Sequence, residues 1–177
     1  MGAWRGLLAE VVETRHASLV AYGYLLTSSR PDAEDLVQDA LVKVFSRVRT
    51  LPNAAAADQY VRKAMLTLYL DRRRRDQAWG LLRRSIATAD GVVGPEDTVA
   101  ASTDVRASLA ALSPRERACV VLRHFDDLSV AEIAARLGLA EGSVKRYLSD
   151  GLRRLGSELI DDGATVSVVA HGREGRN

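Results

Sequence analysis

The chain has 177 residues, of which 47% are hydrophobic and only 5% aromatic, and its formal net charge is +2. The length allows one domain or two small ones, and a core rich in Ala, Leu and Val but poor in rings is typical of helices. The sequence has no run of about 18 apolar residues and no signal-peptide pattern, and its three histidines are not at metal-ligand spacing. We therefore expect a soluble, cytoplasmic protein that uses no metal and no cofactor.

The single cysteine, Cys119, excludes an intrachain disulfide. It stands in the apolar run ACVVL, which favours a buried core thiol. A redox-sensing thiol is the alternative that the sequence alone leaves open.

Three segments of the N-terminal half carry apolar residues at helical intervals. The first is 4–27. After a break at 28–31, Pro31 suits the first turn of a second helix, whose acidic start matches the positive end of a helix dipole. Leu51-Pro52-Asn53 ends that helix, and a third runs from about 55 to 75.

The third helix and the residues that follow it are strongly basic. Residues 60–84 contain eight basic and two acidic side chains, a density that repels itself unless a polyanion or an acidic surface is near. Tyr60, Tyr69 and Trp79 are interleaved with these charges. Rings beside cations suit single-stranded nucleic acid, because bases stack on rings while phosphates meet the charges. The alternative is that the tyrosines belong to the core and only the arginines face water.

The helical pattern stops at about Ser85 and resumes after about Ser102. The segment between them contains two glycines, a proline and acidic residues, which is typical of a linker. We predict an all-α protein with two small helical domains, divided as 5–84, a flexible linker at 85–104, and 105–160. Residues 161–177 lack periodicity and are expected to be a disordered tail.

The C-terminal domain has two explicit helix starts. Ser113 is followed by Pro114 at the first helical position and by Glu116 three residues on, and Ser129 stands three residues before Glu132. Both spacings match a capping box, in which the Ser and Glu side chains each bind a backbone amide.

Residues 130–148 fit a helix-turn-helix. Ala134 is small where two helices would cross, and Gly138 stands where the turn needs a positive φ. The second helix, from about Glu141, is expected to place six polar or basic side chains toward a DNA major groove. They are Ser143, Lys145, Arg146, Ser149, Arg153 and Arg154. An ordinary helical hairpin with a solvated basic face is the alternative. Ala140 departs from the pattern, since a Ser or Thr cap there would be worth about 1 kcal/mol.

Taken together, these motifs resemble a bacterial RNA polymerase sigma factor of the extracytoplasmic-function group, and more loosely its SigE-like subfamily. AEDLVQDALVKVF at 33–45 is similar to region 2.2, and YVRKAMLTLYLDRRRR at 60–75 is similar to regions 2.3 and 2.4. Residues 112–155 are similar to region 4. The resemblance covers about 19–160.

The resemblance implies a role for each matching position. The polymerase-contacting positions would be Asp35, Gln38 and Asp39. The path of −10 promoter DNA would be lined by Arg62, Lys63, Thr67, Arg72, Arg73 and Arg74, and the −35 duplex would be met by Ser143, Lys145, Arg146 and Arg153. Thr67 departs from the family, where many members have Asn, so its hydroxyl offers fewer hydrogen bonds to a flipped base.

The resemblance also implies partners. They are core RNA polymerase (its clamp helices and flap), promoter DNA and, in regulated relatives, an anti-sigma factor. The acidic linker residues Asp90, Glu96 and Asp97 would enter the polymerase. We expect no enzymatic activity, because the sequence offers no paired carboxylates, no metal cluster, no phosphate-binding glycine loop and no nucleophile with a neighbouring general base. Two alternatives stay open at this point: a stand-alone LuxR-type regulator, and an RNA-binding or nucleic-acid-processing protein that uses the arginine run.

Overall fold

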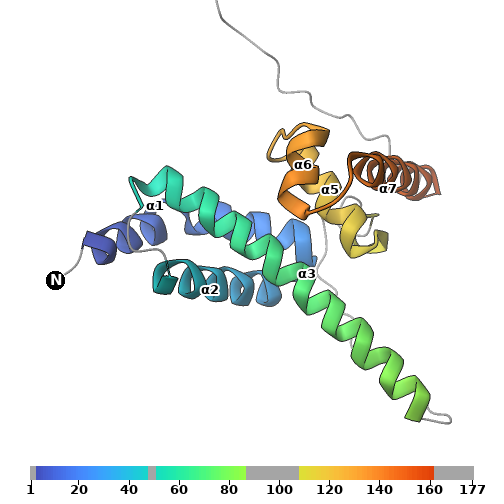
Figure 1. Cartoon of the computed structure of the whole chain (residues 1–177), viewed down its shortest axis with the longest axis horizontal. Helices are drawn as coiled ribbons and strands as arrows, with labels where there is room; N and C mark the ends of the chain where they lie inside the picture. Colours follow the sequence, from blue (N-terminus) through green and yellow to red (C-terminus); the bar gives the residue numbers. More distant parts are fainter. Residues whose placement is uncertain (1–2, 48–50, 87–107, 162–177) are drawn as a thin grey trace, which may run out of the picture.

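The computed structural model describes the backbone of residues 3–47, 51–86 and 108–161, with side chains for 4–47, 51–80 and 108–156 (Figure 1). The first three helices are α1 (Ala3–Thr27), α2 (Arg30–Arg47) and α3 (Ala54–Ile86). After a helical turn at 108–111, the second group consists of α5 (Pro114–His124), α6 (Val130–Leu137) and α7 (Glu141–Asp161). The predicted all-α class is therefore confirmed. Apart from their end residues, the proposed linker and tail lie outside the described residues.

The first three helices pack against one another around one apolar core. Leu26, Leu36 and Met65, one from each helix, are all fully buried. Gly23 lets α1 come close to the other two helices, since a Cβ there would lie 3.0 Å from the Met65 Cε and 3.2 Å from the Ala33 Cβ. The helices are thus held by apolar burial, worth about 25 cal/mol per Å².

The starts of α2 and α3 are set by side chains next to the expected breaks. Ser28 has a φ of 59° where α1 ends, and the Ser29 hydroxyl accepts a hydrogen bond from the Asp32 amide at 3.4 Å. At the start of α3, Asn53 Oδ1 accepts from the Ala56 amide at 2.9 Å. Each such cap satisfies an amide that the helix itself leaves unpaired.

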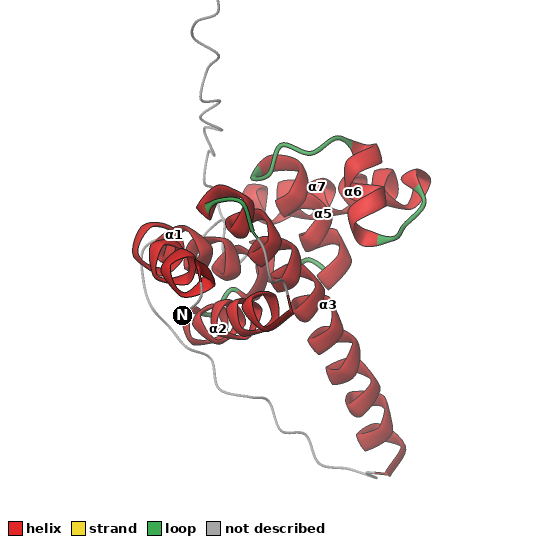
Figure 2. Cartoon of the chain, turned by 60° about the vertical axis from the view of Figure 1, so that its left-hand side comes forward, coloured by secondary structure: helices red, strands yellow, loops and turns green. Residues whose placement is uncertain are grey.

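The prediction that the third helix ends near Arg75 was wrong. It continues to Ile86, and its last turns project from the rest of the molecule (Figures 1 and 2). Arginine is a good helix former, and Asp71 pairs with Arg74 at 3.2 Å across one turn. The arginine run is therefore compatible with a continued helix.

The second helix group confirms the predicted helix-turn-helix. Both capping boxes are present, at Ser113 and at Ser129. Gly138 ends α6 with a φ of 65° and a ψ of 40°, in the left-handed region that glycine adopts without strain. Ala140 provides no side-chain cap, but its carbonyl accepts the Ser143 amide at 2.9 Å. Glu141 in the first turn of α7 offsets part of the missing cap through the helix dipole.

The two helix groups touch each other. Helix α5 packs against both α1 and α3, so the C-terminal group sits beside the middle of α3, as both views show. Among the described helices, none is both long and apolar enough to cross a membrane.

Candidate nucleic-acid interface

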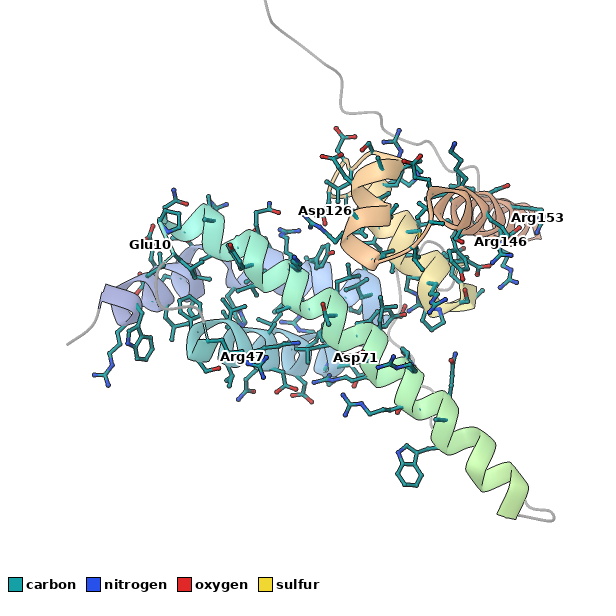
Figure 3. All side chains as sticks on the ribbon, in the orientation of Figure 1. Glu10, Arg47, Asp71, Asp126, Arg146 and Arg153 are labelled. Atoms are coloured by element: carbon teal, nitrogen blue, oxygen red, sulfur yellow. The ribbon has the colours of Figure 1, made fainter. Side chains whose placement is uncertain are left out.

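The exposed face of α7 carries the predicted major-groove residues. Lys145, Arg146 and Ser149 are exposed, whereas their neighbours Val144 and Leu148 are buried. In Figure 3, Arg146 and Arg153 lie on α7 at the side of the molecule away from α1 and α2. The buried positions fix the rotation of the helix, and the cations are left facing solvent on its other side.

Three further predicted residues on α7 have partners or partial burial. Ser143 is half-buried. Arg153 pairs with Asp150 at 2.8 Å and is 75% exposed, so this surface pair is weak. Arg154 reaches Glu116 of α5 at 3.1 Å. Glu116 is buried, so Arg154 serves to hold α7 against α5, and its contact with DNA stays a prediction.

The second candidate surface lies on α3. Lys63, Thr67 and Arg74 are exposed and Arg73 is half-buried. The Thr67 hydroxyl donates to the Lys63 carbonyl at 3.0 Å. In this structure the donor capacity of the hydroxyl is therefore used within the helix, and its lone pairs are what it offers to a nucleic acid.

Arg62 differs from the other predicted −10 residues because it is largely enclosed. Its side chain is 18% exposed, and its Nε lies 2.8 Å from Asp58 Oδ2. Its guanidinium also lies 4.8 Å from the centroid of the Tyr22 ring and 3.6 Å from Asp126 of the α5–α6 loop. The structure thus places Arg62 between the two helix groups.

Arg72 and Asp39 join two predicted sets of residues. The Arg72 guanidinium forms an ion pair with the Asp39 carboxylate, which ties α3 to α2. A residue expected to meet DNA therefore neutralises a residue expected to meet polymerase.

The aromatic residues in the basic segment divide between the two interpretations. Tyr69 is 3% exposed and belongs to the core, with the Arg73 guanidinium 5.7 Å from its ring centroid. Tyr60 and Trp79 are 51% and 61% exposed. Of the three rings in the basic segment, Tyr60 and Trp79 are therefore the ones open to stack on a base.

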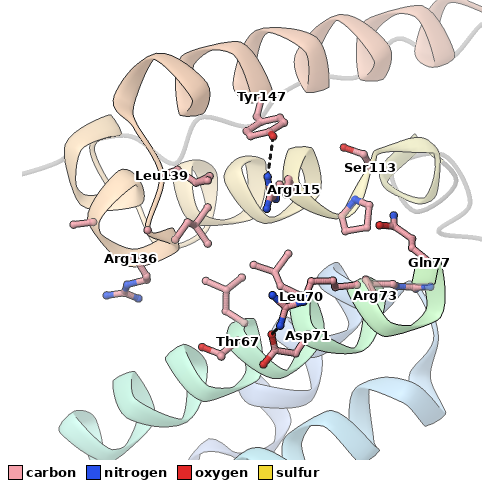
Figure 4. Close-up of a pocket in the computed structure, with 16 residues that line it drawn as sticks. Thr67, Leu70, Asp71, Arg73, Gln77, Ser113, Arg115, Arg136, Leu139 and Tyr147 are labelled. Carbon is pink, nitrogen blue, oxygen red and sulfur yellow. Dashed lines mark hydrogen bonds and ion pairs between the residues drawn. The ribbon is translucent and has the colours of Figure 1, made fainter. Parts of the chain in front are cut away.

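A cleft of about 720 Å³ separates α3 from the helix-turn-helix (Figure 4). Thr67 and Asp71 line one wall, and the Arg115–Tyr147 hydrogen bond of 3.3 Å crosses the other. This hydrogen bond lowers the pKa of the Tyr147 hydroxyl. The basic residues of the lining are Arg73, Arg74, Arg115 and Arg136. With four arginines and one aspartate, the cleft attracts anions.

Two of the three predicted polymerase-binding residues border an apolar hollow between α1 and α2. Asp35 and Gln38 line this hollow, which has a volume of about 700 Å³. Exposed Trp4, Val12 and Val42 line it as well. An apolar hollow with acids at its edge fits an amphipathic partner segment that carries basic residues.

The sequence interpretation missed two residues between the helix groups, Arg117 and Asp126. Arg117 is 4% exposed and donates to the Leu26 carbonyl at 2.8 Å and to the Ser28 hydroxyl at 3.2 Å. Its position in the run ERACVVL, on the apolar side of α5, was a signal that it would be buried. Asp126 stands in a polar loop, where its contact with Arg62 could not be anticipated.

The comparisons with known proteins match both halves of the chain. Residues 102–155 match the family described as Sigma-70, region 4. The chain is 32% identical to an RNA polymerase sigma-E factor of Streptomyces coelicolor, over 85% of each chain. The chain belongs to the RNA polymerase sigma factors. It is also 29% identical to the extracytoplasmic-function sigma factor SigL of Mycobacterium tuberculosis, over 90% of this chain and 92% of that one.

A solved structure supports the fold of this extracytoplasmic-function sigma factor. The sigma factor RpoE of Bartonella quintana, crystallised with the anti-sigma factor NepR, superposes with a TM-score of 0.59 at 21% identity, over 89% of this chain and 97% of that one. The relatives extend over both helix groups, and α5–α7 contain most of the segment that matches region 4. The stand-alone LuxR-type regulator is therefore not favoured.

Proposed function

We propose that the chain directs core RNA polymerase to promoters through two DNA contacts, one on α3 and one on α7. The observation that carries this proposal is the presence of two separate basic surfaces on a chain of the sigma family. Lys145 and Arg146 are exposed on α7, and Lys63, Thr67 and Arg74 are exposed on α3.

The α7 surface suits duplex DNA at the −35 element. A single helix fits the major groove, where Arg and Lys bind base acceptors and phosphates. The α3 surface suits the −10 element, because the exposed rings of Tyr60 and Trp79 can stack on unpaired bases. Since both contacts belong to one chain, binding of the first raises the effective concentration of the second.

Docking on polymerase is assigned to the hollow between α1 and α2. Beside this apolar surface, the Asp35 carboxylate can accept hydrogen bonds, and the Gln38 amide can both donate and accept them. Asp39 is neutralised by Arg72, so we expect it to contribute less to polymerase binding than Asp35.

Three finer proposals accompany this role. The protein works in the cytoplasm, where polymerase and the promoter are found. It catalyses no reaction of its own, since polymerase supplies the chemistry. An anti-sigma factor binds it, a proposal that rests on the complex of RpoE with NepR at the level of the fold.

The test combines polymerase binding with initiation. Core polymerase is titrated with the chain and with Asp35→Ala and Gln38→Ala, and run-off transcription is measured on a library of promoter fragments. We expect specific transcripts only when the chain is added, and weaker polymerase binding by both variants. Glu10→Ala, on the exposed part of α1, is the control. A chain that binds the fragments but supports no transcription with core polymerase would contradict the proposal.

A further inference from the structure

The contact between the two helix groups is built from specific polar side chains. Asp126, in the loop after α5, accepts a hydrogen bond from the Tyr22 hydroxyl at 3.3 Å and pairs with Arg62 at 3.6 Å. Tyr22 is 2% exposed, and the Asp126 side chain is 10% exposed. We call this packing of the two helix groups the closed arrangement. In it, the Asp126 carboxylate of region 4 is enclosed by the Tyr22 ring and the Arg62 guanidinium of region 2.

A second contact lies at the end of α1. Arg117 of α5 donates to the Leu26 carbonyl and to the Ser28 hydroxyl. Leu26 belongs to the last turn of α1, whose carbonyls carry partial negative charge. The Arg117 Nε is buried without a hydrogen-bond partner in the described part of the chain. Buried charge that is incompletely paired makes a contact easier to separate than an apolar one.

The closed arrangement is too compact to hold both promoter elements at once. Elements named −10 and −35 are about 25 base pairs apart, which is roughly 85 Å of B-form DNA. Helix α3 has 33 residues and is therefore about 50 Å long, and α5 packs directly on it. The helix groups must separate before α3 and α7 can reach their two elements.

We infer that Asp126 acts as an internal substitute for a DNA phosphate. Asp58 on the same helix pairs with Arg62 Nε, and the Asp126 carboxylate occupies the position beside Arg62 Nη1 that a phosphate would take. Region 2 therefore cannot bind single-stranded DNA through Arg62 while region 4 is docked. The inference rests on the proposed function. It predicts that domain closure and DNA binding exclude each other, because both use the same guanidinium.

Asp126→Asn tests this inference, with Asp127→Asn as a matched control. Asp127 is the exposed neighbour, with a φ of 50° that asparagine tolerates well. Both variants remove one negative charge. The radius of gyration of the free chain is measured by small-angle X-ray scattering. The affinity for a short single-stranded oligonucleotide of randomised sequence is measured by fluorescence anisotropy.

We expect Asp126→Asn to enlarge the free chain and to bind the oligonucleotide about fivefold or more tightly, while Asp127→Asn changes neither. Tyr22→Phe, which removes only the hydroxyl, should shift both quantities in the same direction by a smaller amount. Equal effects of the two Asn variants, or no change in either quantity, would overturn the inference. Promoter-specific transcription by the parent chain with core polymerase would then still support the proposed function, and its absence would count against that function separately.

Discussion

Arg154 on α7 donates to the same Glu116 carboxylate oxygen that accepts the Ser113 amide at the start of α5, with N–O distances of 3.1 and 2.8 Å. One buried carboxylate therefore closes the capping box of one helix and anchors another. The contact is part of what holds α7 at a fixed angle to α5, with Lys145 and Arg146 exposed to solvent.

Replacing Arg154 with Ala should destabilise region 4. Loss of a hydrogen bond to a buried carboxylate costs about 1–2 kcal/mol, which hydrogen exchange of the α5 and α7 amides would detect. Arg153→Ala is the control, because its exposed pair with Asp150 is worth less than about 0.5 kcal/mol. Equal protection of these amides from hydrogen exchange in the two variants would show that the contact between Arg154 and Glu116 does not stabilise region 4.

Replacing Lys145 or Arg146 with Ala should weaken duplex promoter binding. If the contact is to a phosphate, the slope of log affinity against log salt concentration should flatten by about one unit. Arg30→Ala is the control, because it removes one positive charge from α2. The Arg30 side chain is 79% exposed and lies far from α7 in the sequence, so this variant should leave the slope unchanged. Identical slopes for all three variants and the parent chain would contradict the placement of α7 in the groove.

Gly138→Ala should destabilise the helix-turn-helix. At a φ of 65° an L-residue costs about 1–2 kcal/mol, although a Cβ would meet no atom within 4 Å. The loss is therefore one of backbone conformation, measurable by hydrogen exchange in α6 and α7. Gly142→Ala, in the first turn of α7 with equal space, should be neutral or stabilise by up to about 1 kcal/mol. A neutral Gly138→Ala variant would show that the turn can do without a left-handed residue.

Cys119 should behave as an inert core thiol. It is fully buried, and burial raises its pKa from 9.0 to about 11. The folded state therefore binds this proton more tightly than the unfolded state. The resulting stability is present below pH 9 and is lost as the pH rises through about 11, to an extent of about 3 kcal/mol.

The measurement for Cys119 is the difference in unfolding free energy between the parent chain and Cys119→Ala as a function of pH. Taking the difference removes the contribution of the tyrosines. Iodoacetamide should also label the native chain slowly and the chain in denaturant quickly. Rapid labelling of the native chain at neutral pH would favour the redox-sensing alternative.

Local signals explain why the helix-turn-helix could be predicted in detail. Ser113, Ser129 and Gly138 act through neighbours within a few residues, and each is found where its spacing indicated. The end of α3 was placed too early, at about Arg75, although arginine is a good helix former. The buried state of Tyr69 depended on tertiary packing, which periodicity could not separate from base stacking.

The residues between the helix groups were harder to predict for a different reason. Asp126 meets Arg62 across 64 positions of sequence, through a relative placement of two domains that no local pattern encodes. Arg117 was the exception, since a charge inside an apolar helix face indicates a specific polar partner. The predicted DNA-contacting role of Arg62 stays a prediction, and its enclosure shows that it changes partners if that role is correct.

Sequencing of transcript 5′ ends shows whether the chain directs core RNA polymerase to specific promoters. Core RNA polymerase is supplied with a genomic promoter library alone, with the parent chain, or with a chain in which Lys145 and Arg146 are both Ala. We expect a set of start sites that appears only with the parent chain, shares a −35 and a −10 element, and is lost or strongly reduced with the double variant. The same start sites with and without the parent chain would contradict the proposed function.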